Sequence, residues 1–279
     1  MRWNVKILLF IILFPAFLNA WGKDSQVKGK KFYSAQSGFY ILTPDKYAIG
    51  CGFSYTMPSS KRTVGFLHQR GKDRFSWDKF KGKFVNADFN YLWFDARGHG
   101  FSVKGQIVVE NGKATILDDA GSWKYFAPTG ENNEWNKMTD DLGLIIENLK
   151  KTKEDNFDPK QIILVGADIG ANTALKYAAK NKEIKAIVLL SPGLNYYDIK
   201  TEPPAREWDG RPCLIVCAKG DKESYEASKQ LKALMDKGAP DDKTKIKLEM
   251  VEGNAHGTDM LGGELDKKIV NWIRETMKN

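Results

Sequence analysis

Cysteine and histidine are both scarce in this chain, which has three of each among 279 residues. An odd and sparse set of cysteines provides no disulfide framework. Cys213 and Cys217 lie four residues apart in an apolar run that is typical of a buried strand, where their Cα atoms would be roughly 13 Å apart, too far for a disulfide bond. We therefore expect buried free thiols, and no cysteine–histidine spacing indicates a metal site.

The chain also lacks internal repeats, low-complexity segments and clusters of lysine, which excludes solenoids and extended disorder. Hydrophobic residues make up 42% and charged residues 28%, as in an ordinary globular protein. The formal net charge is +8, but the basic residues are scattered along the chain. We therefore interpret the charge as a contribution to solubility and expect no nucleic-acid partner.

The N-terminus has the layout of a secretory signal peptide. Two basic residues precede an apolar run at 7–18, and the small residue Ala20 follows at a plausible cleavage point. The run is short for a membrane span, so an uncleaved membrane anchor is the weaker alternative. We predict a signal peptide at 1–20, a flexible lead-in at 21–37, and a secreted or periplasmic protein without stable membrane insertion.

Short apolar runs alternate with amphipathic stretches through most of the remaining chain. This alternation predicts βαβ units and a mainly parallel sheet. We expect strands over 38–43, 47–57, 63–67, 89–94, 162–166, 184–190, 213–218 and 245–251. We expect helices over 138–149, 171–178, 224–237 and 265–277.

An interruption follows the fourth expected strand. Asn111-Gly112 separates two short runs and predicts a hairpin over 106–117. Together with the aromatic residues that follow, up to Trp135, we expect this insertion at 106–135 to form a small cap or pocket wall. Residues 193–211 are rich in proline and aromatics, and we expect an irregular link there.

The clearest local pattern is a buried strand, a turn flanked by Gly166 and Gly170, and a helix with small apolar residues at helical spacing. A nucleophile elbow, with the sequence Gly-x-Ser-x-Gly, has this architecture and exposes its central side chain above the sheet. The flanking glycines allow the neighbouring strand and helix to approach closely. In this chain the central residue is Asp168 instead of serine.

Three polar residues follow the carboxyl ends of three expected strands: Asp168, Asp221 and His256. Open parallel sheets gather their ligand sites at these strand ends. We expect His256 to act as a general base and Asp221 to orient its ring, with Asp198 as a substitute for Asp221.

From about residue 38 to its end, the chain resembles α/β-hydrolase-fold proteins, in particular an esterase-like bacterial branch. The motifs that carry the resemblance are Asp-x-Arg-Gly-His-Gly-x-Ser at 95–102, His-x-x-Gly at 68–71, Leu-Leu-Ser-Pro-Gly at 189–193 and Ala-His-Gly-Thr-Asp at 255–259. The order nucleophile, acid, histidine is also that of the family. The resemblance implies a single α/β domain over 38–279, with a mostly parallel central sheet and helices on both faces.

The family's oxyanion hole uses two backbone N–H groups. The resemblance assigns one to Ile169, the residue after the nucleophile position, and the other to the loop after His68, at Gln69. We expect His68 and His99 to be structural hydrogen-bonding residues. No cofactor is implied.

Three interpretations of Asp168 stay open. The first is a carboxylic-ester hydrolase scaffold whose nucleophile position holds aspartate, with low or absent activity on a small, uncharged ester-like substrate. The second is an aspartate-nucleophile hydrolase, because the arrangement also resembles haloalkane dehalogenases and epoxide hydrolases, although those usually place an aromatic residue where Ile169 stands. The third is a binding protein that has lost catalysis.

Overall fold

The computed structural model describes residues 35–55, 60–84, 89–104, 106–110, 113–117, 122–130, 133–153, 155–238 and 245–278. The predicted signal peptide at 1–20 lies outside these residues, as does most of the predicted lead-in. The last three residues of that lead-in belong instead to the first strand, which begins at Ala35.

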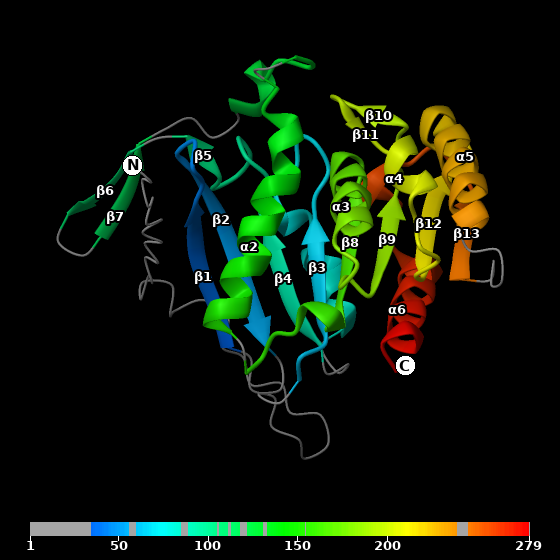
Figure 1. The fold of residues 1–279 in the computed structure, drawn as a ribbon, viewed down its shortest axis with the longest axis horizontal. Coiled ribbons are helices and arrows are strands. Elements are labelled where there is room, and N and C mark those ends of the chain that lie inside the picture. The colour runs from blue at the N-terminus through cyan, green and yellow to red at the C-terminus, as the bar shows by residue number, and fades with distance from the viewer. Residues whose placement is uncertain are drawn as a thin grey trace, which may run out of the picture.

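A nine-stranded sheet forms the centre of the molecule (Figure 1). Its main path runs β1-β2-β4-β3-β8-β9-β12-β13, and the short β5 pairs with β2. β1 and β2 pair antiparallel with their neighbours on this path, whereas every pairing from β4 to β13 is parallel. The strands are β1 (Ala35–Leu42), β2 (Tyr47–Tyr55), β3 (Thr63–Leu67), β4 (Asn90–Phe94), β5 (Val103–Lys104), β8 (Ile162–Ala167), β9 (Ala186–Leu190), β12 (Cys213–Ala218) and β13 (Ile246–Val251).

Helices cover both faces of this sheet, as predicted. Successive residues of a strand point to opposite faces, so a strand buried on both sides is apolar along its whole length. In β8, Ile162 and Leu164 pack under α2 and α3, while Ile163 and Val165 pack against the other layer, which contains α1 and α6. The helices are α1 (Asp78–Lys81), α2 (Met138–Thr152), α3 (Ile169–Lys180), α4 (Glu202–Arg206), α5 (Lys222–Gly238) and α6 (Gly263–Lys278).

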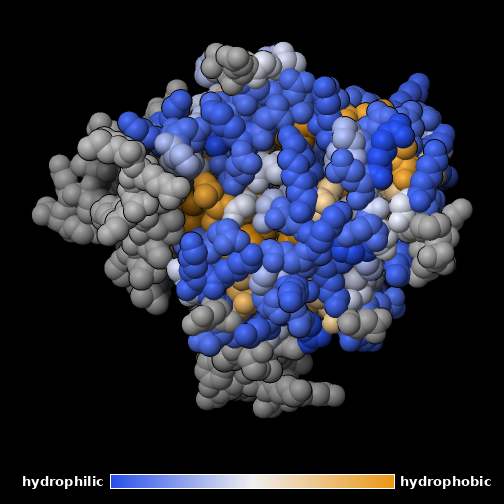
Figure 2. All heavy atoms as spheres, in the orientation of Figure 1, coloured by the Kyte–Doolittle hydropathy of each residue, from blue (hydrophilic) through white to orange (hydrophobic). Residues whose placement is uncertain are grey.

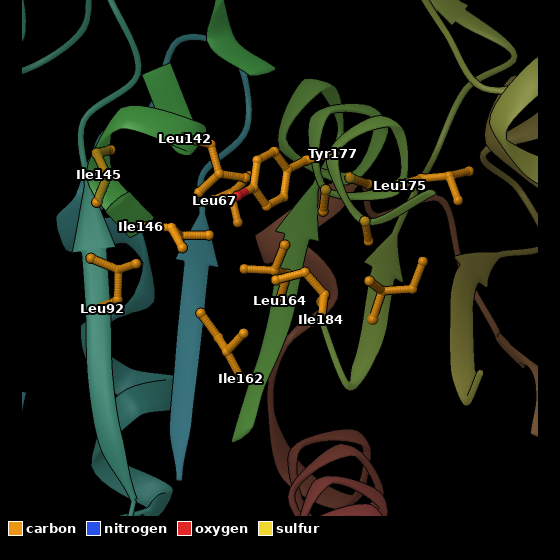
Figure 3. Packing of buried hydrophobic residues seen from close by; sticks show 14 of the residues in the cluster. Leu67, Leu92, Leu142, Ile145, Ile146, Ile162, Leu164, Leu175, Tyr177 and Ile184 are labelled. Atoms are coloured by element: carbon orange, nitrogen blue, oxygen red, sulfur yellow. The ribbon is translucent and has the colours of Figure 1, made fainter. Parts of the chain in front are cut away.

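The larger apolar cluster lies between the sheet and α2, α3 and α5. Figure 3 shows Leu142 and Ile146 from α2 pointing toward Leu67 and Leu92 on the strands beneath. The outer surface of the same side is mostly hydrophilic (Figure 2), as expected for amphipathic helices that bury one face. The three cysteines are buried and free, which confirms the prediction from their spacing.

Two predictions in the connecting segments need correction. The hairpin is present as β6 (Gln106–Glu110) and β7 (Lys113–Leu117), but it projects beyond the β1 edge of the sheet and does not wall the strand ends (Figure 1). The link at 193–211, predicted to be irregular, contains a second hairpin, β10 (Asn195–Tyr196) with β11 (Ile199–Lys200), and then α4. Among the described residues, no helix is both long and apolar enough to cross a membrane.

Candidate active site

Asp168 lies on the tight turn between β8 and α3, with φ of 54° and ψ of −120°. A positive φ is strained for a residue with a side chain, and such strain is typical of functional positions. The turn is closed by backbone contact: a Cβ on Gly166 would lie 2.2 Å from the Gly170 carbonyl oxygen, and one on Gly170 would lie 2.3 Å from the Leu67 carbonyl oxygen. Only glycine fits at these two positions, so the elbow frame is intact although its tip is aspartate.

The three candidate side chains meet at the carboxyl ends of their strands. His256 Nδ1 lies 2.7 Å from Asp221 Oδ2, within hydrogen-bonding distance, and His256 Nε2 lies 3.6 Å from Asp168 Oδ1. The partner of the imidazole is therefore Asp221, whereas Asp198 lies in the β10–β11 turn. The arrangement is that of a nucleophile–histidine–acid triad with a carboxylate at the nucleophile position.

The two carboxylates change the protonation of the ring between them. Asp168 and, to a smaller extent, Asp221 raise the pKa of His256 to about 9, although partial burial opposes this shift. At neutral pH the ring is therefore an imidazolium, which bridges two anions. In that form both nitrogens carry protons, and His256 is unable to act as a general base.

We expect the stability of the native chain to decrease as the pH rises from 6.5 to 9. The pKa of His256 is about 9 in the folded state against an ordinary value of 6.5, so the folded state binds more protons in this window. The imidazole is 35% exposed, and solvent screening limits the loss to about 1–2 kcal/mol in the free energy of unfolding. Urea titrations across the window would measure it. An equal decrease of the unfolding free energy with pH in Asp168→Asn would contradict the assignment of this effect to the interaction of His256 with Asp168.

The loop after β3 approaches the other side of Asp168. The Arg70 backbone N–H donates to Asp168 Oδ2 at 3.0 Å, so this group, one residue beyond the predicted Gln69, is directed at the carboxylate. Ile169, the other predicted donor, is the first residue of α3, where a backbone N–H has no partner within the helix. Asp168 Oδ2 thus accepts a backbone N–H from the loop in which the resemblance predicts one oxyanion-hole donor.

Gln69 contributes through its side chain, a role that the sequence pattern does not indicate. Its Oε1 accepts hydrogen bonds from the backbone N–H of Thr258 at 2.7 Å and from Thr258 Oγ1 at 2.9 Å. Ser191 Oγ accepts the neighbouring Gly257 N–H at 2.9 Å. Two side chains from the ends of β3 and β9 therefore hold the loop that carries His256.

His68 and His99 have structural roles, as predicted. His68 Nε2 accepts the Ala96 N–H at 2.8 Å and His99 Nε2 accepts the Gly71 N–H at 3.2 Å, so in each ring Nδ1 carries the proton and donates to a backbone carbonyl. Burial lowers the pKa of both rings, that of His99 to about 3. These neutral rings join the 68–74 loop to the 95–102 loop.

The 95–102 loop is in turn fixed by two buried charges. Asp95 accepts the backbone N–H groups of Arg74 at 2.8 Å and Phe101 at 2.9 Å. The Arg97 guanidinium is 2% exposed and binds both oxygens of Asp141 on α2, at 2.7 and 2.6 Å. The same side chain also contacts two further carboxylates, those of Asp45 and Glu134.

Aromatic residues of the β10–β11 hairpin lie beside the site. Tyr196 presents its ring to His256 at 6.4 Å between centroids, and Tyr197 stacks on Trp135 at 4.6 Å. The Arg70 guanidinium lies over the Tyr197 ring and donates to its hydroxyl. Trp135, at the end of the 106–135 insertion, therefore contacts the β10–β11 turn through Tyr197.

A small apolar cavity lies beneath the elbow. Its volume is about 10 Å³, which is room for about one water molecule and too little for an acyl or alkyl group of a substrate. The residues that line it are Leu67, His68, Phe94, Ala96, Met138, Ile169, Gly170 and Thr173.

Comparisons with known proteins identify the family and the fold of the chain. A sequence family described as serine aminopeptidase, S33, matches residues 58–219, which is more than half of the chain. This range includes the elbow and the 68–74 and 95–102 loops but ends before Asp221 and His256. No curated protein matches the sequence.

Several solved structures share the fold. An esterase from Pyrococcus furiosus is 17% identical, with a TM-score of 0.64 over 88% of this chain and 92% of that chain. A monoacylglycerol lipase from Paleococcus ferrophilus is 15% identical, with a TM-score of 0.57 over 88% of this chain and all of that chain. An esterase from Exiguobacterium antarcticum is 13% identical, with a TM-score of 0.58 over 84% and 98%. At these identities the similarity concerns the α/β-hydrolase fold.

Proposed function

Because the chain belongs to the serine aminopeptidase S33 family of α/β hydrolases, we propose that it is an exported ester-hydrolase scaffold whose nucleophile position holds Asp168. Its turnover of esters is low or absent as the chain stands. The observation that carries this proposal is the triad geometry, in which His256 lies 2.7 Å from Asp221 and 3.6 Å from residue 168.

Aspartate at this position opposes ester hydrolysis in three ways. Ester hydrolysis at such a site needs a neutral histidine that accepts a proton from the attacking nucleophile. The Asp168 carboxylate instead raises the pKa of His256 to about 9 and keeps the ring charged. Attack of Asp168 on an ester would also have to form a mixed anhydride and expel an alkoxide. In addition, Asp168 Oδ2 already occupies the Arg70 N–H that would stabilise an oxyanion.

The substrate class that fits the scaffold is a small, uncharged ester. Asp168 and Asp221 place two negative charges beside the imidazolium, which disfavours the binding of a substrate that carries a negative charge of its own. Two of the similar structures are esterases, and a third is a monoacylglycerol lipase. No step of this chemistry calls for a metal or an organic cofactor.

One observation favours a second candidate, an aspartate-nucleophile hydrolase. Asp168 Oδ2 is held by the Arg70 N–H, while Oδ1 faces His256. In that mechanism Oδ1 attacks a saturated carbon and either displaces a halide or opens an epoxide, whose oxygen then takes a proton from water. Either reaction forms an ester on Asp168. Esterification removes the Asp168 charge that raises the pKa of His256, so the ring can release its proton to solvent and become neutral. Water then attacks the ester carbonyl, its proton passes to His256, and the carboxylate and the alcohol product are released.

Two substrate panels test these proposals. Turnover of p-nitrophenyl esters that appears only in Asp168→Ser supports the ester scaffold. Halide release or diol formation by the native chain, with a mass-spectrometric adduct on residue 168 and loss of the reaction in Asp168→Ala, supports the aspartate nucleophile. If no variant turns over either panel but the native chain still binds an ester, a binding function would replace both catalytic proposals.

Export is tested separately, because the predicted signal peptide at 1–20 lies outside the described residues. We expect the secreted or periplasmic form to begin near Trp21. N-terminal sequencing of the exported protein measures this directly. A mature chain that still begins at Met1 and stays with the membrane would support the uncleaved anchor instead.

A further inference from the structure

Gln69 lies between the two loops that carry the candidate chemistry. It directly precedes Arg70, whose backbone N–H donates to Asp168. Its side chain reaches in the other direction, to Thr258, two residues after His256. Gln69 is 7% exposed, so this contact is shielded from water.

The chemistry of the partners fixes the orientation of the Gln69 amide. The backbone N–H of Thr258 is a donor only, so the side-chain atom that faces it at 2.7 Å must be the amide oxygen. The same oxygen also lies 2.9 Å from Thr258 Oγ1. One buried acceptor therefore satisfies two buried donors of the histidine loop.

Steric contact reinforces these hydrogen bonds. A Cβ on Gly257 would lie 2.3 Å from Gln69 Oε1, and Gly257 adopts a positive φ of 57°. The backbone just after His256 thus touches the Gln69 amide without an intervening side chain. On the loop of Gln69 itself, the Gln69 carbonyl accepts hydrogen bonds from His68 Nδ1 and the Lys72 N–H, which holds the residue in place.

The hydrogen bonds from the Thr258 N–H and Thr258 Oγ1 to Gln69 Oε1 form an amide bridge between the two loops. From this bridge we propose that Gln69 is a positioning residue, whose side-chain amide sets the separation between the His256 ring and the side chain at position 168. Gln69 acts through Thr258 and Gly257 and touches neither the reacting atoms nor the ring. This inference deepens the proposed function, on which it rests for its catalytic meaning, but the geometry it describes exists in the native chain.

Removing the acceptor has a defined consequence. Without Gln69 Oε1, two buried donors of Thr258 lose their partner, and the loop shifts to satisfy them with water. His256 then moves away from the Asp168 carboxylate, which is the main group that raises its pKa. The other groups that face the ring are Asp221 and the Tyr196 ring, and both lie outside the loop that shifts.

The imidazole itself provides a readout that needs no turnover. The chain has three histidines, and burial lowers the pKa of the other two, so a ring that titrates near pH 9 in an NMR titration is His256. In Gln69→Leu, which is similar in size but has no acceptor, we expect its pKa to fall by about one unit. In Gln69→Glu, which keeps an acceptor oxygen, we expect it to stay at or above the native value.

Thr258 provides a graded control from the donor side. Thr258→Val removes the hydroxyl donor but keeps the backbone N–H, so we expect a smaller fall than in Gln69→Leu, whereas Thr258→Ser keeps both donors and the native pKa. An unchanged His256 pKa in folded Gln69→Leu would overturn the inference. Should Gln69→Leu fail to fold, an unchanged pKa in Thr258→Val would overturn it instead.

Steady-state kinetics tests whether the amide bridge of Gln69 matters for the reaction. In an Asp168→Ser background we expect Gln69→Leu to lower kcat for a p-nitrophenyl ester about tenfold with KM unchanged, because a misplaced base weakens proton transfer but not binding. Inactivity of Asp168→Ser itself would contradict the proposed function and leave the NMR result to decide the role of Gln69. An active background in which Gln69→Leu leaves kcat unchanged would contradict the positioning role.

Discussion

Replacing Asp168 with serine is expected to raise kcat/KM for a p-nitrophenyl ester at least about a thousandfold over the native chain. The serine hydroxyl would occupy the tip of the same strained turn, near His256 Nε2. Loss of the carboxylate removes the main cause of the raised pKa of His256, so the ring becomes neutral at a lower pH and can accept the hydroxyl proton. The Arg70 N–H is released for the oxyanion.

Two variants control this result. Asp168→Asn removes the negative charge but offers no hydroxyl, so it should stay at the native level of ester turnover. Asp168→Ser combined with His256→Ala should lose most of the gain, because nothing then removes the serine proton. An increase of the same size in the Asn and Ser variants would show that relief of charge, rather than a new nucleophile, is responsible.

The second large effect concerns stability. We expect Arg97→Met to lower the free energy of unfolding by about 3–5 kcal/mol, because it leaves the Asp141 carboxylate buried without its partner. Domains of this kind have only about 5–15 kcal/mol in total, so the variant approaches the limit of folding. Urea denaturation followed by circular dichroism would measure the loss.

The double variant Arg97→Met with Asp141→Leu separates charge burial from packing. With both buried ions replaced by apolar side chains, most of the lost stability should return. Asp45 and Glu134 keep Lys137 as a partner, at 3.0 and 2.9 Å, so they remain paired. A single variant that costs less than about 1 kcal/mol, as exposed ion pairs do, would show that the Arg97 network contributes little to the fold.

The main sheet was predictable because its strands are buried on both faces and therefore read as continuous apolar runs, such as Cys213–Ala218. The β10–β11 hairpin was not predictable, since its strands have two residues each and its turn consists of Tyr197 and Asp198. Both turn residues have positive φ, a conformation that Asn-Gly adopts more readily, so the usual turn signal is missing. The start of α4 has a signal that could have been used, prolines at its first positions.

The triad candidates were accessible from the sequence for a similar reason. Asp168, Asp221 and His256 each follow a strand of a parallel sheet, and such strand ends share one edge. The amide bridge of Gln69 was not accessible, because the partner of a side chain depends on the path of two loops. Nor does a strand pattern indicate which N–H of the 68–74 loop turns toward residue 168.

The backbone contact beneath the elbow has a further consequence. The Leu67 carbonyl oxygen lies 2.3 Å from where a Cβ on Gly170 would be, so the backbones of α3 and β3 approach each other here with no side chain between them. This close approach involves Gly170 and Leu67, and the side chain at position 168 takes no part in it. A single substitution at position 168 would therefore change the chemistry presented at the tip of the turn without changing this backbone packing.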